Sequence, residues 1–508
     1  MTFPRASGIL LHPTSLPGPH GVGDLGPEAY RFLEFLHAAG HKLWQVLPLN
    51  PTGYGDSPFQ CFSASAGNPL LLNLDRFIEK GILSKTDLAG SPVWPLESVD
   101  FGRVIAYKTP LLKKAARNFL ETATSNDRGS FETFCRSNAG WLDDFALFMA
   151  VKDAHDLVAW PRWPADIASR KPEALREWSG RLAQEIEAIK YWQFEFTQQW
   201  QSLRDYARER NIRIIGDIPI YVAHDSADVW ANREFFWLDA AGNASKISGV
   251  PPDYFSATGQ LWGNPIYNWA HLKETNYNWW VDRFRAAMRL YDIMRIDHFR
   301  GFEAYWEVPG GESTAQNGRW VKGPGAELFS VVQSELGELP IIAENLGVIT
   351  PEVEAIRTQF NYPGMAILQF AFGNDPQGPS FRPHNYDRNL VAYTGTHDND
   401  TTSGWWSSKG MGDSIRTADD VLKEHAFARA YLGIGPDDPI HWALIRAVLA
   451  SVANTAIIPL QDVLGLGSHA RMNLPGTPSG NWRWRMKPDS LTENIVSRLK
   501  EMNKNYDR

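Results

Sequence analysis

Cysteine is nearly absent from this sequence: Cys61 and Cys135 are the only two in 508 residues. Two thiols cannot build a disulfide framework or a thiolate metal cluster, so a reducing compartment is the simplest setting. The apolar run at the N-terminus is interrupted by His12 and Pro13, which argues against a signal peptide. We therefore expect a cytoplasmic protein.

Long apolar runs and basic clusters are also missing. The longest late apolar stretch, residues 447–460, falls short of the roughly 20 residues that a membrane-spanning helix needs. The formal net charge is −8, and no run of Lys or Arg could follow a phosphate backbone. These features argue against a membrane or a nucleic acid as partner.

The nucleotide-binding motifs are either absent or weak. No G-x-x-x-x-G-K-[ST] loop occurs, and GVGDLG (residues 21–26) matches G-x-G-x-x-G only in its letters. Pro17 and Pro19 separate it from the preceding apolar run, and no acidic residue ends the next run, where a ribose contact is required. We interpret these glycines as a loop leading into a helix that begins at Pro27.

Eight short apolar runs alternate with helical patterns along the chain. Buried parallel strands have continuous apolar sequences because helices cover their outer face, so this pattern predicts a (β/α)₈ barrel. A doubly wound sheet is the rival fold. The runs are SGILLH (7–12), LWQVLPL (43–49), IRIIGDIPI (212–220), DIMRID (292–297), LPIIAE (339–344), MAILQF (365–370), LVAYTG (390–395) and AIIPL (456–460). Helices are predicted at 27–39, 276–291, 325–336, 351–360, 438–454 and 488–503.

Two gaps between these runs are too long for one crossover. We expect a single catalytic domain, 1–508, with insertions at about 50–211 after the second strand and 221–275 after the third. About fifty residues follow the eighth strand, too few for a further β-sandwich. The predicted fold is therefore an α/β (β/α)₈ TIM barrel with inserted, mainly helical subdomains and no C-terminal β-sandwich domain.

Acidic residues gather at the ends of the predicted strands, where the catalytic groups of a barrel lie. Asp217, Asp297, Glu344 and Asp398 would bring like charges into one mouth, an arrangement that lowers stability unless chemistry or a cation uses it. Retaining glycoside cleavage needs two carboxyl groups about 5 Å apart, one attacking and one protonating the leaving oxygen. Asp297 and Glu344 fit that need, although either alone could be a solvated strand-end acid or an ion-pair partner of Arg295 or Arg300.

The segment THDNDT (396–401) has two interpretations. His and Asp clusters can bind zinc or manganese, but barrel metallohydrolases carry a His-x-His after an early strand, and none occurs here. Hydrogen bonds from His397 and Asp398 to sugar hydroxyls account for the same residues. Aromatic rings in Gly- and Pro-rich segments, such as Tyr54 and Tyr254, also suit sugar faces better than core packing.

Six segments are similar to those of the amylomaltases, glycoside hydrolase family 77 of the α-amylase clan. The resemblance runs from about residue 7 to 485, nearly the whole chain. Four segments look like the conserved regions of the clan: GDIPIYVAHDSADVW (216–230), MRIDHFRGF (294–302), IIAENLG (341–347) and YTGTHDNDTT (393–402). Two are more specific to amylomaltases: PTGYGDSPFQ (51–60) and DYFSATGQLWGNPIY (253–267).

The resemblance implies a 4-α-glucanotransferase that moves α-1,4-glucan segments between maltooligosaccharides or starch- and glycogen-like glucans, as a monomer or homodimer, without a cofactor or metal. It implies a retaining double displacement with Asp297 as nucleophile, Glu344 as general acid and base, and Asp398 as the third acid, which binds sugar hydroxyls. The matched substrate-binding residues are Tyr54, Asp56, Phe59, Asp217, Asp253, Phe255, Trp262, Asn264, Arg295, His298 and His397.

Two other functions remain open at this point. A plain α-1,4-glucan hydrolase would use the same three acids, but the 253–267 segment resembles a lid that shields the glycosyl-enzyme from water and so favours transfer. A non-catalytic α-glucan-binding protein would be expected to have lost at least one acid, and all three are present.

The chain also departs from the family pattern at several positions. His224 stands where an acid is expected, and Phe59 replaces a tyrosine, keeping a ring face but losing a hydroxyl. Phe101 occupies the place of a tyrosine that often forms a surface site, and Gly373 and Asn374 replace the usual acids. These changes concern acceptor subsites and secondary glucan binding.

Overall fold

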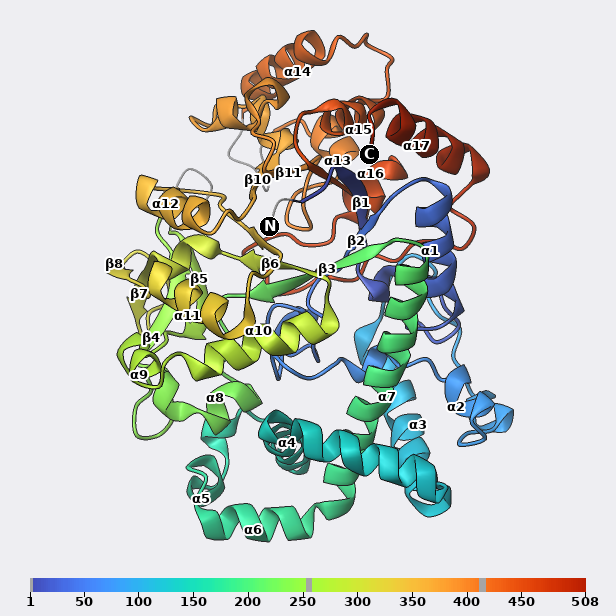
Figure 1. The fold of residues 1–508 in the computed structure, drawn as a ribbon, viewed down its shortest axis with the longest axis vertical. Coiled ribbons are helices and arrows are strands. Elements are labelled where there is room, and N and C mark those ends of the chain that lie inside the picture. Colours follow the sequence, from blue (N-terminus) through green and yellow to red (C-terminus); the bar gives the residue numbers. More distant parts are fainter. Residues whose placement is uncertain (1–2, 253–257, 411–416) are drawn as a thin grey trace.

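The computed structural model describes residues 3–252, 258–410 and 417–508, and an eight-stranded parallel sheet lies at its centre (Figure 1). Each strand falls within or beside one of the eight apolar runs, so all eight predicted strands are confirmed. They are β1 (Ala6–Leu10), β2 (Leu43–Gln45), β3 (Arg213–Pro219), β6 (Ile293–Asp297), β9 (Ile341–Ala343), β10 (Gly364–Ile367), β11 (Leu390–Tyr393) and β12 (Thr455–Pro459).

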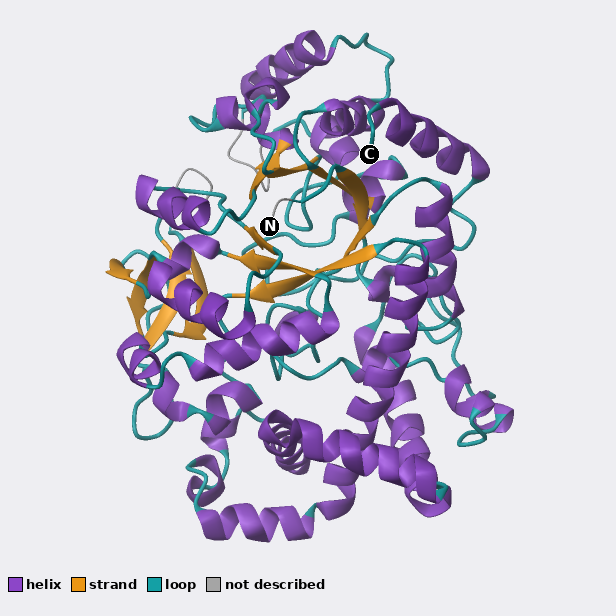
Figure 2. Cartoon of the chain, viewed as in Figure 1, coloured by secondary structure: helices purple, strands orange, loops and turns teal. Residues whose placement is uncertain are grey.

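The sheet curls round so that its two outer strands meet (Figure 2). The strand order is β10-β11-β12-β1-β2-β3-β6-β9. Between the end strands, the N–H of Ala343 donates to the carbonyl of Pro363 over 2.9 Å, and the N–H of Met365 donates to Oδ1 of Asn345 over 2.8 Å. An open doubly wound sheet has two separate edges, so this junction excludes the rival fold and confirms the (β/α)₈ barrel.

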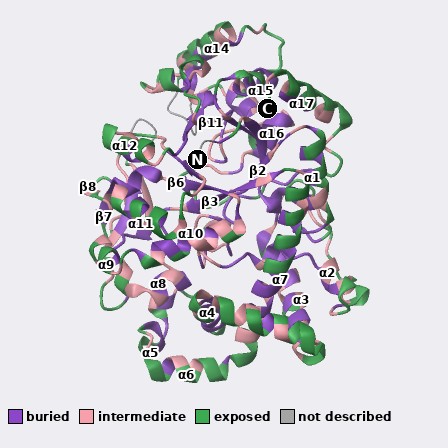
Figure 3. Cartoon of the chain, in the orientation of Figure 1, coloured by how far each residue is buried: buried purple, intermediate pink, exposed green. Residues whose placement is uncertain are grey.

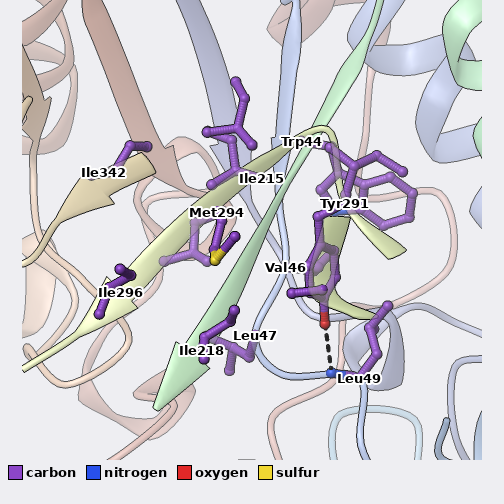
Figure 4. Packing of buried hydrophobic residues seen from close by; sticks show 14 of the residues in the cluster. Trp44, Val46, Leu47, Leu49, Ile215, Ile218, Tyr291, Met294, Ile296 and Ile342 are labelled. Atoms are coloured by element: carbon purple, nitrogen blue, oxygen red, sulfur yellow. Dashed lines mark hydrogen bonds between the residues drawn. The ribbon is translucent and has the colours of Figure 1, made fainter. Parts of the chain in front are cut away.

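The barrel strands are buried almost throughout, as their continuous apolar sequences require (Figure 3). Figure 4 shows the core around Tyr291, whose ring lies where a side chain on Gly216 would collide with it: a Cβ there would come within 2.0 Å. The backbone N–H of Leu49 donates to the Tyr291 hydroxyl over 3.2 Å. Gly216 thus leaves room for the Tyr291 ring, whose hydroxyl holds the chain just after β2 at Leu49.

Helices surround the barrel, and the six predicted ones are present with ends shifted by a few residues. They are α1 (Pro27–Ala38), α10 (Asn278–Leu290), α11 (Ala326–Leu336), α12 (Pro351–Gln359), α15 (Ile440–Ala450) and α17 (Glu493–Asn505). Helix α1 begins at Pro27, where the N–H that proline lacks has no partner within the helix anyway. The glycines of residues 21–26 lie in the loop before it, as predicted.

The chain between β2 and β3 forms a helical layer on one side of the barrel (Figure 1). Its helices are α2 (Asp75–Glu79), α3 (Phe101–Thr122), α4 (Ser125–Ala154), α5 (Ala165–Ala168), α6 (Pro172–Arg181) and α7 (Ala183–Glu209). Two glutamines of α7 hold the loop that follows β2. The Gln193 amide exchanges hydrogen bonds of 2.7 and 2.9 Å with the backbone of Gly67, and Gln199 accepts from the N–H of Asn73 over 2.8 Å.

A small antiparallel sheet, in the order β5-β4-β7-β8, was not predicted. Its strands are β4 (Lys246–Val250), β5 (Gln260–Pro265), β7 (Ala304–Pro309) and β8 (Arg319–Lys322). Two strands come before β6 and two after it, so no continuous stretch of sequence shows the pairing. The segment 221–275, which also contains α8 (Ala227–Ala231) and α9 (Trp269–Glu274), is therefore completed by chain from beyond β6.

The last third of the chain adds short helices at the mouth and outside of the barrel. They are α13 (Thr402–Ser407), α14 (Ala418–Leu432) and α16 (Leu460–Val463). From β12 to residue 508, all of which is described, no further strand joins either sheet. Among the described helices, none combines the length and the apolarity that a bilayer crossing demands.

Candidate active site

Asp297 and Glu344 lie side by side at the C-terminal ends of two neighbouring barrel strands. Ile296 of β6 pairs with Ala343 of β9, and the N–H of Glu344 donates to the carbonyl of Ile296 over 3.1 Å. The next residue of each strand therefore reaches the same point of the rim. Asp297 is partly exposed there, whereas Glu344 is buried.

Arg295 binds two carboxylates with one guanidinium nitrogen. Its Nη1 lies 2.6 Å from Oδ2 of Asp217 and 3.0 Å from Oδ1 of Asp297. Burial alone lowers the pKa of Arg295, but Asp217, Asp297 and Glu344 outweigh burial and raise this pKa above its ordinary value. The buried cation is therefore permanently charged and offsets the repulsion among three acids.

Both carboxyl oxygens of Glu344 accept backbone hydrogen bonds. Oε2 accepts from the N–H of His298 over 2.7 Å, and Oε1 accepts from the N–H of Leu346 over 3.0 Å. Burial raises the pKa of Glu344 to about 7; Arg295 opposes this rise and Asp297 adds to it. A carboxyl group with that pKa can both give and take a proton near neutral pH.

His298 connects Glu344 with the small antiparallel sheet. Its backbone is left-handed, with φ 52° and ψ 49°, and its ring lies perpendicular to that of Trp262 on β5, with 4.7 Å between centroids. Burial lowers the pKa of His298 to about 3, so the imidazole is neutral. The sequence-predicted residues His298 and Trp262 are thus brought together beside Glu344.

His397 and Asp398 follow β11 on the same rim. Nε2 of His397 lies 3.5 Å from Oδ2 of Asp398, whose side chain is 45% exposed. Burial lowers the pKa of His397, and the charge of Asp398 opposes this. The charge of Arg295 lowers the pKa of His397 further, and that of Asp297 opposes this.

The loop at residues 51–62 brings Phe59 into this group. Thr52 and Cys61 form an antiparallel bridge, and the ring of Phe59 stacks on His397 with centroids 4.9 Å apart and planes 19° apart. At the tip of the loop, Tyr54 is 77% exposed and has no place in the buried part of the site. Asp56 beside it is partly buried, and burial raises its pKa against the opposing effect of Arg483.

Asn264 on β5 connects two loops, one at Val222 and one at Gln60. Its Nδ2 donates to the carbonyl of Val222 over 2.9 Å, and its amide exchanges hydrogen bonds of 3.2 and 3.3 Å with Gln60. This buried side chain therefore ties β5 to the 51–62 loop. The other predicted residues of the covering segment, Asp253 and Phe255, lie outside the described residues, as does Tyr254.

The positions that depart from the family pattern have ordinary structural partners. His224 makes a 2.8 Å hydrogen bond through Nε2 to the carbonyl of Gly242. Phe101 is buried at the start of α3, and the amide of Asn374 donates to Asp420 over 2.8 Å.

Three residues near the site were not predicted: Arg471, Asn473 and Trp482. Nδ2 of Asn473 donates to Oδ1 of Asp398 over 2.6 Å, and Nη2 of Arg471 donates to the carbonyl of Asp398 over 2.6 Å. The Trp482 ring lies 5.7 Å from Phe59 and 5.8 Å from His397, measured between centroids. Their segment follows the last barrel strand, so its position after a strand end was the one signal available.

No group of three or more His, Cys, Asp or Glu side chains is arranged to hold a metal ion in the described ranges 3–252, 258–410 and 417–508. In the THDNDT segment, His397 contacts Phe59 and Asp398 contacts Asn473.

Comparison with known proteins identifies the family. A family model described as 4-alpha-glucanotransferase, glycoside hydrolase family 77, matches residues 11–492. This chain belongs to the 4-alpha-glucanotransferase family. It is 51% identical to the 4-alpha-glucanotransferase of Synechocystis sp. over 99% of this chain and 98% of the relative, and 50% identical to that of Thermus thermophilus over 99% of both.

A solved structure of this family has the same fold. Amylomaltase from Streptococcus agalactiae in complex with acarbose superposes with a TM-score of 0.94 at 41% identity, covering 99% of each chain. The predicted family, barrel fold and 4-alpha-glucanotransferase class of enzyme are therefore confirmed.

Proposed function

We propose that this 4-alpha-glucanotransferase transfers α-1,4-glucan segments by a retaining double displacement on Asp297 and Glu344. The observation that carries the proposal is the position of these two acids on adjacent strands, with Arg295 ion-paired to Asp297 and the pKa of Glu344 raised to about 7. One group can then act as an anionic nucleophile while its neighbour carries a proton.

In the first half-reaction, the carboxylate of Asp297 attacks the anomeric carbon of the donor. The bond from that carbon to the glycosidic oxygen breaks, and protonated Glu344 gives its proton to the departing oxygen. The leaving glucan diffuses away with a free 4-OH, and the remaining segment is esterified to Asp297.

In the second half-reaction, Glu344 is ionised and takes the proton from the 4-OH of an acceptor glucan. The acceptor oxygen attacks the anomeric carbon, and the bond to Asp297 breaks. Two inversions leave the new linkage in the α configuration, and both acids return to their starting states.

The remaining residues bind and shape the sugar in this proposal. Asp398 accepts hydrogen bonds from sugar hydroxyls, and His397 donates to them from a ring fixed by Phe59. Trp262 covers an apolar sugar face, and exposed Tyr54 meets the acceptor beyond the reacting bond. Asp217 acts through Arg295, and Asn264 through the loops that it ties.

The proposed substrates are α-glucan oligosaccharides, because the similar amylomaltase was solved with acarbose. We also propose that the 508 residues act as one catalytic domain, located in the cytoplasm as the low cysteine content suggests.

The test is to incubate the protein with maltotriose, to separate the products by length and to measure free reducing ends. A ladder of longer maltosaccharides plus glucose, with nearly constant reducing ends and loss of activity in Asp297→Ala, supports transfer. Rising reducing ends without longer products would indicate a hydrolase, and no product from maltotriose or longer glucans would indicate a binding protein.

A further inference from the structure

Asp398 lies on a loop that follows β11 and has no register pairing within the barrel sheet. Strand β11 ends at Tyr393 and α13 begins at Thr402, so the chain between them has no strand partner. Among the described residues of the loop, Asp398 has a long bond of 3.3 Å from its N–H to Oγ1 of Thr396 and a 3.5 Å contact of its Oδ2 with Nε2 of His397. Gln369 and Asp462 hold the two ends of the loop, at Asp400 and at Thr394 and Thr402, and these bonds do not reach Asp398 itself.

Residues 471–473 contact His397 and Asp398 through three hydrogen bonds. The N–H of Asn473 donates to the carbonyl of His397 over 3.0 Å, and the Asn473 amide donates to the carboxylate of Asp398. The third comes from Arg471, whose Nη2 donates to the carbonyl of Asp398 over 2.6 Å while its Nε donates to the carbonyl of Asn473 over 2.7 Å. One guanidinium thus joins the main chains of both loops.

We propose that Arg471 is a positioning residue for Asp398 in glucan transfer. The inference rests on the proposed role of Asp398. In these contacts Arg471 binds the peptide carbonyl of Asp398 and not its carboxylate, so it sets the direction of the peptide from which the side chain projects. The planar guanidinium has donors in a fixed fork, and two carbonyls fix its own orientation.

The alternative is that Arg471 only stabilises its loop. Arg5 offers a matched control, because its guanidinium also donates to main-chain carbonyls, those of Ser451 at 2.9 Å and Ala453 at 3.2 Å. Arg5 stands just before β1, at the end of the barrel opposite to the candidate site. Because Arg5 also bonds the carbonyls of Tyr506 and Leu449, Arg5→Met removes more main-chain hydrogen bonds than the Arg471 variants do, without touching Asp398.

The experiment compares the wild type with Arg471→Met, Arg471→Lys, Arg471→Ala and Arg5→Met in the maltotriose assay, well below the melting temperature of each. We expect Arg471→Met to lower kcat by about 100-fold, since a displacement of about 1 Å in a group that positions the reacting sugar has that effect. The KM for maltotriose should change by less than about threefold. Arg471→Lys should retain more activity than Arg471→Met, and guanidinium ion should partly restore Arg471→Ala. Arg5→Met should keep the wild-type kcat.

A double variant shows whether Arg471 acts through Asp398. If it does, Arg471→Met should lower kcat no further in an Asp398→Asn background. Wild-type kcat in the Arg471 variants, or additive losses in the double variant, would overturn the inference. This failure is distinct from failure of the proposed function, in which the wild type itself would not transfer or Asp398→Asn would stay fully active.

Discussion

The backbone N–H of His298 reaches Oε2 of Glu344 over 2.7 Å from a left-handed conformation, with φ 52° and ψ 49°. A residue with a Cβ is strained in this region, by about 1–2 kcal/mol, whereas glycine is not. This strained conformation points the N–H of His298 at the carboxyl group of Glu344, which is proposed to move the proton.

This relationship predicts different effects of two substitutions at His298. Both His298→Gly and His298→Ala lose the ring contact with Trp262. Alanine still has a Cβ and stays strained in the left-handed conformation, whereas glycine does not. We expect His298→Ala to be less stable than His298→Gly by about 1 kcal/mol, measured by urea unfolding. Equal stabilities would show that the left-handed backbone carries no strain here.

The pKa of Glu344 predicts how activity depends on pH. The donor half-reaction needs protonated Glu344, and its pKa of about 7 means that the protonated fraction falls as pH rises through 7. We expect kcat/KM for the donor maltotriose to decline above about pH 7, and Glu344→Gln to abolish transfer. If kcat/KM holds level up to pH 9, Glu344 is not the acid.

Replacing Arg295 should destabilise the fold more than replacing Asp217. Arg295→Met leaves buried Asp217 without its cation and should lower the free energy of unfolding by about 3–5 kcal/mol. Asp217→Asn leaves Arg295 paired with Asp297 at 3.0 Å and should have a smaller effect. Chemical denaturation of both variants at pH 7 checks the order, which would be reversed if Asp217 alone anchored the site.

Phe59 should affect activity through the stacking of its ring on His397. Phe59→Leu removes the stack on His397, and an aromatic pair contributes about 0.5–1.5 kcal/mol, so kcat/KM should fall by about 2- to 12-fold. Phe59→Tyr keeps the face and should stay within twofold of the wild type. The maltotriose assay separates the two, and equal losses in both would exclude stacking as the cause.

The barrel and its acids could be predicted because each strand lies in a short apolar run and the acids lie near the C-terminal ends of such runs. Asp297 and Glu344 lie at the ends of β6 and β9, which are neighbours in the sheet. Their proximity therefore follows from the strand order and the register of this pair. The small sheet could not be foreseen because β4 and β7 pair across the intervening β6. Arg471 and Trp482 were missed because they lie on an irregular segment, whose path is set by side-chain contacts and not by periodicity.

Helix α7 gives one further consequence. Gln193 and Gln199 act as substitute backbone partners for the chain at Gly67 and Asn73, the continuation of the loop that carries Phe59. Through these bonds the helical layer supports the loop that follows β2, including the part that carries Phe59. If this loop binds the acceptor as proposed, we expect substitutions in the supporting helices to change acceptor preference without altering any proposed substrate-binding residue.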